Sequence, residues 1–222
     1  MSKIKIGWAE ESLVPDKKVS LCGQFFERIS EYVESEISVT AMAVEADGEQ
    51  MIMASVDVVN LTEAVIDYAR EKFAKLTSEI DPKKIIVCAT HTHTSLTIAN
   101  PAGTEPNADG SAFSTAVKIL DEFLPEDKKY TPLVKPDDDV LTPQEALELV
   151  TDKIALAAKK AWEGRQDAYY ANEFGRAPIG MCRRVSYDDG SGQMWGDTNT
   201  ANFVALEGGN DSGIELIYTF DT

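Results

Sequence analysis

The sequence predicts an α/β fold with a mixed, largely central β-sheet that contains a β-α-β unit and is flanked by helices. Three observations predict it: apolar–polar alternation over residues 37–46, helical apolar spacing from Thr62 onward, and a short apolar run over residues 85–89. A chain of 222 residues can bury one sizeable core, so we expect a single α/β domain over residues 1–222.

The first elements in chain order are a hairpin and the β-α-β unit. Asp47-Gly48 is typical of a hairpin turn and makes residues 51–58 the returning strand. The helix that begins at Thr62 ends before Asp81-Pro82, and residues 85–89 then form the next strand. Strands joined by a crossover helix run parallel, so these two strands end at the same edge of the sheet.

The second half of the chain predicts a long helix and two further strands. In Thr142-Pro-Gln-Glu145, an N-cap threonine, a proline at the first helical position and a glutamate three residues after the threonine form a capping box. This helix should end near Gly164, with strands at 168–174 and 214–220. Residues 96–141 are rich in Pro, Gly, Asn and Asp, and we expect an insertion or a lid there.

Composition excludes several classes of partner. The 38 acidic residues exceed the 21 Lys and Arg by 17, and this net negative charge repels nucleic acid and anionic membrane surfaces. No apolar run is long enough for a membrane span. Three cysteines are too few for a disulfide framework, and Cys88 should be buried in its apolar strand. No signal peptide is seen at the N-terminus, so a cytoplasmic location is expected.

Both histidines of the chain, His91 and His93, come directly after the strand at 85–89. Side chains two residues apart on an extended backbone point to the same side, which suits a metal site or an acid–base pair. Asp57 ends the parallel neighbouring strand and could be a metal ligand or an outer-shell partner that orients an imidazole. The alternatives are a hydrogen-bonded structural pair and an aspartate that caps backbone groups.

A second candidate region is Met181-Cys-Arg-Arg-Val185. Adjacent arginines on an extended segment point to opposite faces, so only one of Arg183 and Arg184 could enter a pocket. A guanidinium there could hold a carboxylate or a developing oxyanion. The alternative is a pair of surface arginines that balance some of the acidic residues.

On these residues the chain resembles the N-terminal part of the neutral/alkaline (non-lysosomal) ceramidase family. The resemblance rests on Ala54-Ser-Val-Asp57, on Ala89-Thr-His-Thr-His-Thr94, and on the segment around Arg183 followed by Glu207-Gly208. It implies a zinc-dependent amidohydrolase that cleaves the amide of an N-acyl sphingoid lipid. It further implies His91 as the zinc ligand, His93 as a catalytic helper, and an active-site arginine at Arg183 or Arg184, with Arg183 preferred.

The sequence departs from the family in two ways. Thr94-Ser-Leu96 stands where the family has Ser-Gly-Pro, and no third histidine is present, although the family completes its zinc site with a second histidine, a glutamate and a tyrosine. We therefore expect a truncated member that carries part of the site, or a homo-oligomer in which another subunit supplies the missing ligands. The substrate would be a small-molecule or lipid-like N-acyl compound. The alternative is a non-catalytic α/β binding or assembly module whose histidine pair is structural or a relic.

Overall fold

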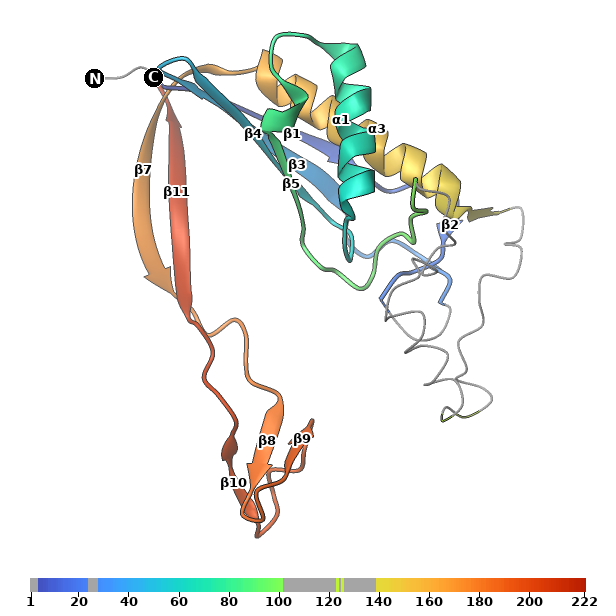
Figure 1. Ribbon diagram of the computed structural model, residues 1–222, viewed down its shortest axis with the longest axis vertical. Helices are drawn as coiled ribbons and strands as arrows, with labels where there is room; N and C mark the ends of the chain where they lie inside the picture. Colours follow the sequence, from blue (N-terminus) through green and yellow to red (C-terminus); the bar gives the residue numbers. More distant parts are fainter. Residues whose placement is uncertain (1–3, 24–27, 102–122, 124, 126–138) are drawn as a thin grey trace. The chain divides into compact units, whose positions relative to one another are not determined.

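The computed structural model describes residues 4–23, 28–101, 123, 125 and 139–222 (Figure 1). These residues belong to two compact units, within residues 1–168 and within residues 169–222. The single domain over residues 1–222 stays a prediction. So does the insertion or lid at 96–141, most of which lies outside the described residues.

The mixed α/β fold class predicted from the sequence is confirmed. A six-stranded sheet has the order β11-β7-β1-β3-β4-β5, in which β1, β3 and β4 are antiparallel neighbours and β4 and β5 are parallel. Strand β7 pairs with β1 through residues 166–168, at the end of the first unit. The strands are β1 (Ile4–Ser12), β3 (Ser38–Ala46), β4 (Glu49–Val56), β5 (Ile85–Ala89), β7 (Gln166–Arg176) and β11 (Gly213–Asp221).

The predicted β-α-β unit is formed by β4, helix α1 (Glu63–Leu76) and β5. Thr62 is the N-cap of α1, and its hydroxyl accepts a hydrogen bond from the backbone N–H of Val65. A short 3₁₀ helix, η1 (Pro82–Lys84), leads into β5. The register pairs Val56 with Ala89, so both strands end together at one edge of the sheet, as parallel pairing requires.

Strand β1 was not predicted from the sequence. It pairs with β3 along all nine of its residues and therefore lies inside the sheet. The large apolar residues Ile4, Ile6 and Trp8 stand at every second position, and this period of two is the signal that could have identified the strand.

Helices α1 and α3 (Pro143–Glu163) cover one face of β1, β3, β4 and β5 (Figure 1). The capping box is confirmed: the Thr142 hydroxyl accepts from the Glu145 N–H, and the Glu145 carboxylate accepts from the Thr142 N–H. The helix ends at Gly164, as predicted. The core between the layers is made mostly of small and branched apolar side chains, among them Val39, Ala41, Ala43, Ile52, Ala54, Val56, Val150, Ile154, Ala157, Ala158 and Ala161.

The buried carboxylate of Glu11 links β1 to α3. It accepts hydrogen bonds from the ammonium groups of Lys160 and Lys153, the latter at 3.0 Å. The hydrogen bond with Lys160 lowers the pKa of Glu11 most, and the hydrogen bond and charge of Lys153 lower it further, against the opposing effect of burial. The acid is therefore ionised and paired at neutral pH, as a buried charge must be.

The opposite face of these four strands carries a row of large apolar side chains in register. Trp8 pairs with Met42, Met42 with Met53, and Met53 with Ile86. Trp8 and Ile86 are each about half exposed. Cys88 follows on the same face of β5 and is exposed, so the prediction that it is buried was wrong. The sequence of β5 is apolar on both faces, but the helices cover only one of them.

The second unit contains a small three-stranded antiparallel sheet with the order β10-β8-β9, in addition to the neighbouring strands β7 and β11. Its strands are β8 (Arg184–Tyr187), β9 (Gly192–Met194) and β10 (Phe203–Leu206). In the first unit, β2 (Lys18–Val19) and β6 (Val140–Leu141) form a short parallel pair. Among the described residues, no helix has the length and apolar character needed to cross a membrane.

Candidate functional site

The histidine pair lies beyond the carboxyl end of β5, where the chain has already left the strand. The backbone N–H of Thr90 donates to Val56 O at 3.0 Å, and that of His91 donates to Val58 O at 3.1 Å, so this segment still follows the end of β4. His91 has a φ of +64°, in the left-handed region. The backbone is therefore not extended at His91, contrary to the expectation behind the spacing argument.

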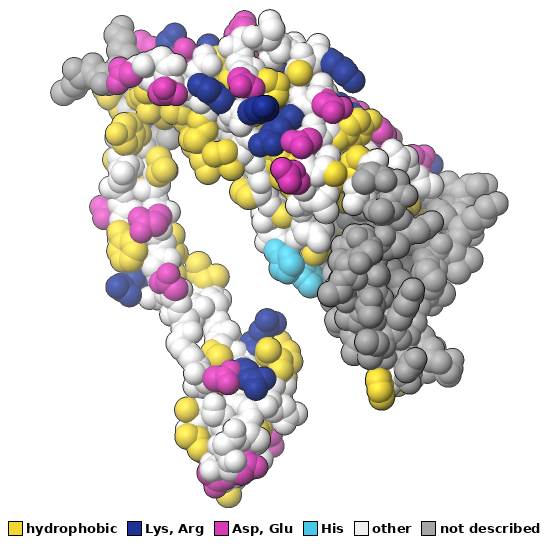
Figure 2. Space-filling view, in the orientation of Figure 1, with side chains coloured by type: hydrophobic (Ala, Val, Ile, Leu, Met, Phe, Trp, Pro, Cys, Tyr) yellow, Lys and Arg dark blue, Asp and Glu magenta, His cyan; other side chains and the backbone are white. Residues whose placement is uncertain are grey.

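The two imidazoles nevertheless face each other. Their Nε2 atoms are 3.3 Å apart, and the rings meet edge to face with centroids 4.9 Å apart. Both side chains are exposed, and Figure 2 shows them together on the surface of the molecule.

Backbone carbonyl groups fix the orientation of both rings. His91 Nδ1 lies 2.7 Å from the carbonyl oxygen of Val59, and His93 Nδ1 lies 2.7 Å from that of Gly23. A carbonyl oxygen can only accept a hydrogen bond, so each Nδ1 must carry the proton and donate it. In the neutral state each Nε2 then carries a lone pair 3.3 Å from the other Nε2, and a proton or a cation between them would relieve the repulsion.

This arrangement fits part of a zinc site. Metal-bound histidines usually donate the N–H of their other nitrogen to a carbonyl or carboxylate, as both rings do here. Two nitrogens bound to one tetrahedral zinc ion at about 2.0–2.1 Å would lie about 3.3–3.4 Å apart, close to the observed separation. No group of three or more His, Cys, Asp and Glu side chains suited to a metal occurs in the described part of the chain. The described residues thus offer two nitrogen donors of a site that usually has three protein ligands.

An N-terminal segment holds the backbone around His93. The Arg28 guanidinium donates to the carbonyl oxygen of His93 at 2.5 Å, and the Cys22 N–H donates to Ser95 O at 2.9 Å. Burial raises the pKa of the Cys22 thiol, which keeps the group neutral beside the histidines. Sequence reasoning missed Gly23 and Arg28, because no local pattern places residues 20–23 and Arg28 beside residues 93–97.

Asp57 lies next to the site, at the end of β4. Its Oδ2 accepts from the backbone N–H of Ser38 at 2.9 Å, and its Oδ1 accepts from the Thr90 hydroxyl at 3.0 Å. These contacts join the start of β3 to the end of β5. The Asp57 carboxylate therefore caps strand ends. Any influence on the imidazoles would pass through Thr90, the residue before His91, and the outer-shell role of Asp57 stays a prediction.

Arg183 and Arg184 belong to the second unit. The Arg183 guanidinium stacks on the Trp195 ring, 5.1 Å from the ring centroid, whereas Arg184 Nε pairs with Glu207 Oε2 at 2.7 Å. The two arginines therefore have different partners. An active-site role for Arg183, or for Arg184 in its place, stays a prediction.

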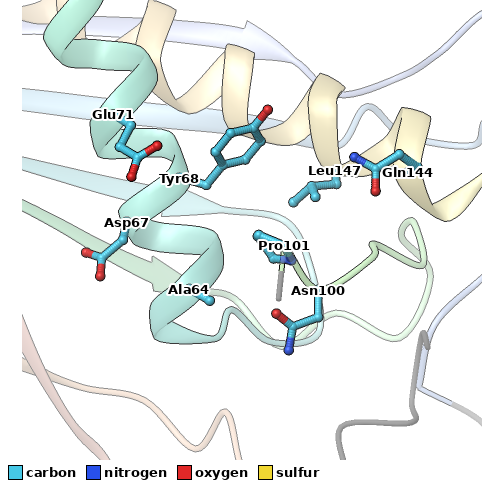
Figure 3. Close-up of a pocket in the computed structure, with 8 residues that line it drawn as sticks. All are labelled: Ala64, Asp67, Tyr68, Glu71, Asn100, Pro101, Gln144 and Leu147. Atoms are coloured by element: carbon cyan, nitrogen blue, oxygen red, sulfur yellow. The ribbon is translucent and has the colours of Figure 1, made fainter. Parts of the chain in front are cut away.

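A separate hollow of about 430 Å³ lies between α1, the start of α3 and the segment Asn100-Pro101 (Figure 3). Asp67 and Glu71 make its lining acidic, and Tyr68 lies beside them on α1. The Tyr68 hydroxyl donates to Glu148, and that hydrogen bond raises the pKa of Tyr68. None of its lining residues is a histidine or a cysteine, and we assign no ligand to it.

Comparisons with known proteins bear on the fold. No protein-family model and no curated protein matches the chain. The chain is similar in structure to the neutral ceramidase from Pseudomonas aeruginosa (TM-score 0.55, 13% sequence identity) and to a ceramidase complexed with C2 (TM-score 0.53, 14% sequence identity). Each comparison covers 85% of this chain and 25% of the other, so the chain spans about a quarter of the length of the structures it matches. The resemblance predicted from the sequence is thereby supported at the level of the fold alone.

Proposed function

We propose that this chain is part of a zinc-dependent amidohydrolase of the ceramidase type, with His91 as a metal ligand and His93 as the group that assists catalysis beside it. The observation that carries the proposal is the pair of Nε2 atoms 3.3 Å apart, each on a ring whose Nδ1 is held by a backbone carbonyl. The ceramidase-like fold supports it independently.

Each residue would have a distinct role. Zinc, when bound, polarises a carbonyl and lowers the pKa of water toward 7. His91 would hold the metal through Nε2, because its Nδ1 is already bonded to Val59 O. The Nε2 of His93, free of its own proton in the neutral ring, can accept a proton during attack on an amide. Arg183 is proposed to stabilise the developing oxyanion.

The proposed substrate class is an N-acyl amide, lipid-like or small. The ceramidase-like fold supports the lipid-like choice. The net charge of −17 favours a neutral or cationic substrate over an anionic one. A homo-oligomer, in which a second copy supplies further ligands, is part of the proposal, as is a cytoplasmic location.

The metal is tested first. Protein purified without a histidine tag should contain about one zinc ion per chain by elemental analysis, and His91→Ala should lose it. Cys88→Ser is a matched control, because it removes an exposed soft ligand of β5 outside the pair and should leave the zinc content unchanged.

Activity is tested separately on a panel of N-acyl compounds that runs from N-acyl sphingoid bases to short N-acyl amines. We expect zinc-dependent release of the amine, with His93→Asn losing about 100-fold or more in rate, the usual effect of removing a general base. Zinc binding without turnover of any amide would refute the amidohydrolase function and leave the metal site intact.

The hydrogen bonds that hold both rings to backbone carbonyls would equally suit a second candidate, a non-catalytic α/β binding or assembly module. In that protein the two Nε2 atoms would share a proton, and the pair would be structural. A zinc-free chain whose unfolding temperature does not change on addition of zinc would support this second candidate.

A further inference from the structure

The histidine segment is joined to an N-terminal segment by backbone hydrogen bonds. Leu21 and Leu96 form an antiparallel bridge, and the Thr97 N–H donates to Ser20 O at 2.9 Å. Together with the bond from Cys22 to Ser95, these contacts fix the backbone of residues 20–22, directly before one position opposite His93. That position is Gly23.

Gly23 has no room for a side chain. A Cβ built on it would lie 2.6 Å from both Cγ and Nδ1 of His93, closer than such atoms approach in real proteins. The imidazole therefore occupies the space that any other residue would need. Gly23 also has a φ of +99°, which glycine adopts without strain, and this conformation accompanies the carbonyl group that accepts from His93 Nδ1.

We propose that Gly23 is a positioning residue for His93: its missing side chain makes space for the imidazole, and its carbonyl fixes the Nδ1–H tautomer. The ring then presents Nε2 toward His91 instead of toward solvent. The Arg28 guanidinium, bonded to the carbonyl oxygen of His93, holds the backbone of the same residue. Only the measurements on zinc-loaded protein below rest on the proposed function, since the orientation of the ring can be tested without zinc.

Gly48 provides a matched control. It too has a positive φ, +83°, but a Cβ built on it meets no atom within 4 Å. Gly48→Ala therefore reproduces the backbone strain of Gly23→Ala without the conflict with an imidazole. Any difference between the two variants reports the contact with His93.

The direct readout is the ¹⁵N spectrum of the imidazoles in zinc-free protein at about pH 8, where histidine is largely neutral. The chain has two histidines, so the spectrum contains two rings. We expect both to carry the proton on Nδ1. Gly23→Ala should move the His93 signals toward those of the Nε2–H tautomer common in free histidine, while Gly48→Ala leaves both rings unchanged. Unchanged His93 signals in a folded Gly23→Ala protein would overturn the proposal.

A double-mutant cycle keeps the test decisive if Gly23→Ala does not fold. His93→Ala removes the two ring atoms that a Cβ at position 23 would meet at 2.6 Å and leaves only the Cβ of residue 93, at 3.1 Å. In that background Gly23→Ala should lower the unfolding temperature clearly less than it does in the presence of the imidazole. An equally large loss of stability with and without the imidazole would contradict a role that acts through His93.

Measurements on the zinc-loaded protein separate this inference from the proposed function. If the chain binds zinc, Gly23→Ala should leave the zinc content unchanged, because His91 and not His93 is the proposed ligand, and should lower the rate of amide cleavage by the zinc-loaded protein by roughly 10- to 100-fold relative to Gly48→Ala. Equal rates in the two variants would overturn the inference. If the parent binds no zinc, the proposed metal site fails, and the imidazole spectra still decide the role of Gly23.

Discussion

At the scale of single residues, Gly7 shows how closely helix and sheet approach each other. A Cβ on Gly7 would lie 2.0 Å from Ala161 O and 2.7 Å from the Arg165 N–H nitrogen, both backbone atoms. Because neither atom can rotate away as a flexible side chain could, the helix would have to shift. This contact therefore limits β1 to glycine at the point where α3 crosses it.

We expect Gly7→Ala to lower the free energy of unfolding by about 3 kcal/mol, at the upper end of the usual cost of overpacking a core. Urea-induced unfolding measures the change. Gly208→Ala is the control, because a Cβ there meets no atom within 4 Å and the free energy should hardly change. Equal stability of the two variants would show that α3 can move away from the sheet at little cost.

The orientation of the two histidine rings is also decided by single residues. The spacing of His91 and His93 predicts that their side chains share one side of an extended strand, and in the structure the two rings meet. The cause differs from the one expected, because His91 is left-handed and the chain is no longer in β5. Bonds to Val59 and Gly23, and not strand geometry, orient the rings.

At the scale of elements, the start of α3 is set by a capping box of neighbouring residues and by one lysine that is distant in sequence. The Glu145 carboxylate accepts from the Thr142 N–H and hydroxyl at 2.8 Å each, and from the Lys17 ammonium at 3.0 Å. The backbone hydrogen bond from Thr142, followed by the Lys17 bond, lowers the pKa of Glu145 to about 2 from its ordinary 4.5. The ionised form is therefore the one that stabilises the helix.

The sign of the pH dependence follows from this shift. Since folding lowers the pKa, the stabilising contribution of Glu145 is complete above about pH 4.5 and is lost as the pH falls toward 2. Glu145→Gln should therefore flatten the fall in unfolding temperature over this range. Glu71→Gln, at an exposed position of α1, is the control and should keep the wild-type slope. A wild-type slope in Glu145→Gln would contradict the assignment.

The hydroxyl of the same capping box can be tested at neutral pH. Thr142→Ala removes the acceptor for the Glu145 N–H and should cost about 1 kcal/mol of unfolding free energy, as is usual for an N-cap. Chemical denaturation at pH 7 measures this value. No loss of stability would mean that water satisfies the end of the helix equally well.

At the scale of the whole molecule, the dominant electrostatic feature is the excess of 17 negative charges. Such an excess destabilises a compact state through self-repulsion, and salt screens it. We expect the unfolding temperature to rise by several degrees between about 20 mM and about 300 mM NaCl. A neutral osmolyte at matched osmolarity controls for excluded-solute effects. A falling unfolding temperature would indicate that ion pairs such as those of Glu11 outweigh the repulsion.

At the same scale, more of the fold than of the candidate site could be predicted from the sequence. The β-α-β unit and both helices follow from periodicity and end signals that act over a few residues. Strand β1 was missed because its apolar alternation is short and contains Gly7, Glu10 and Glu11. The exposure of Cys88 was also missed, because an apolar strand does not reveal which of its faces a helix will cover.

The sequence by itself determined where the histidines lie, at the end of a strand in a β-α-β unit, since strand, helix and turn signals are local. Only the tertiary structure decided what the pair can do. The carbonyl that fixes the His91 ring belongs to Val59, 32 positions earlier in the sequence, and the one that fixes the His93 ring belongs to Gly23, 70 positions earlier. The space for the His93 ring also depends on Gly23. Orientation and tautomer are set by hydrogen bonds across the fold, and no pattern along the chain records them.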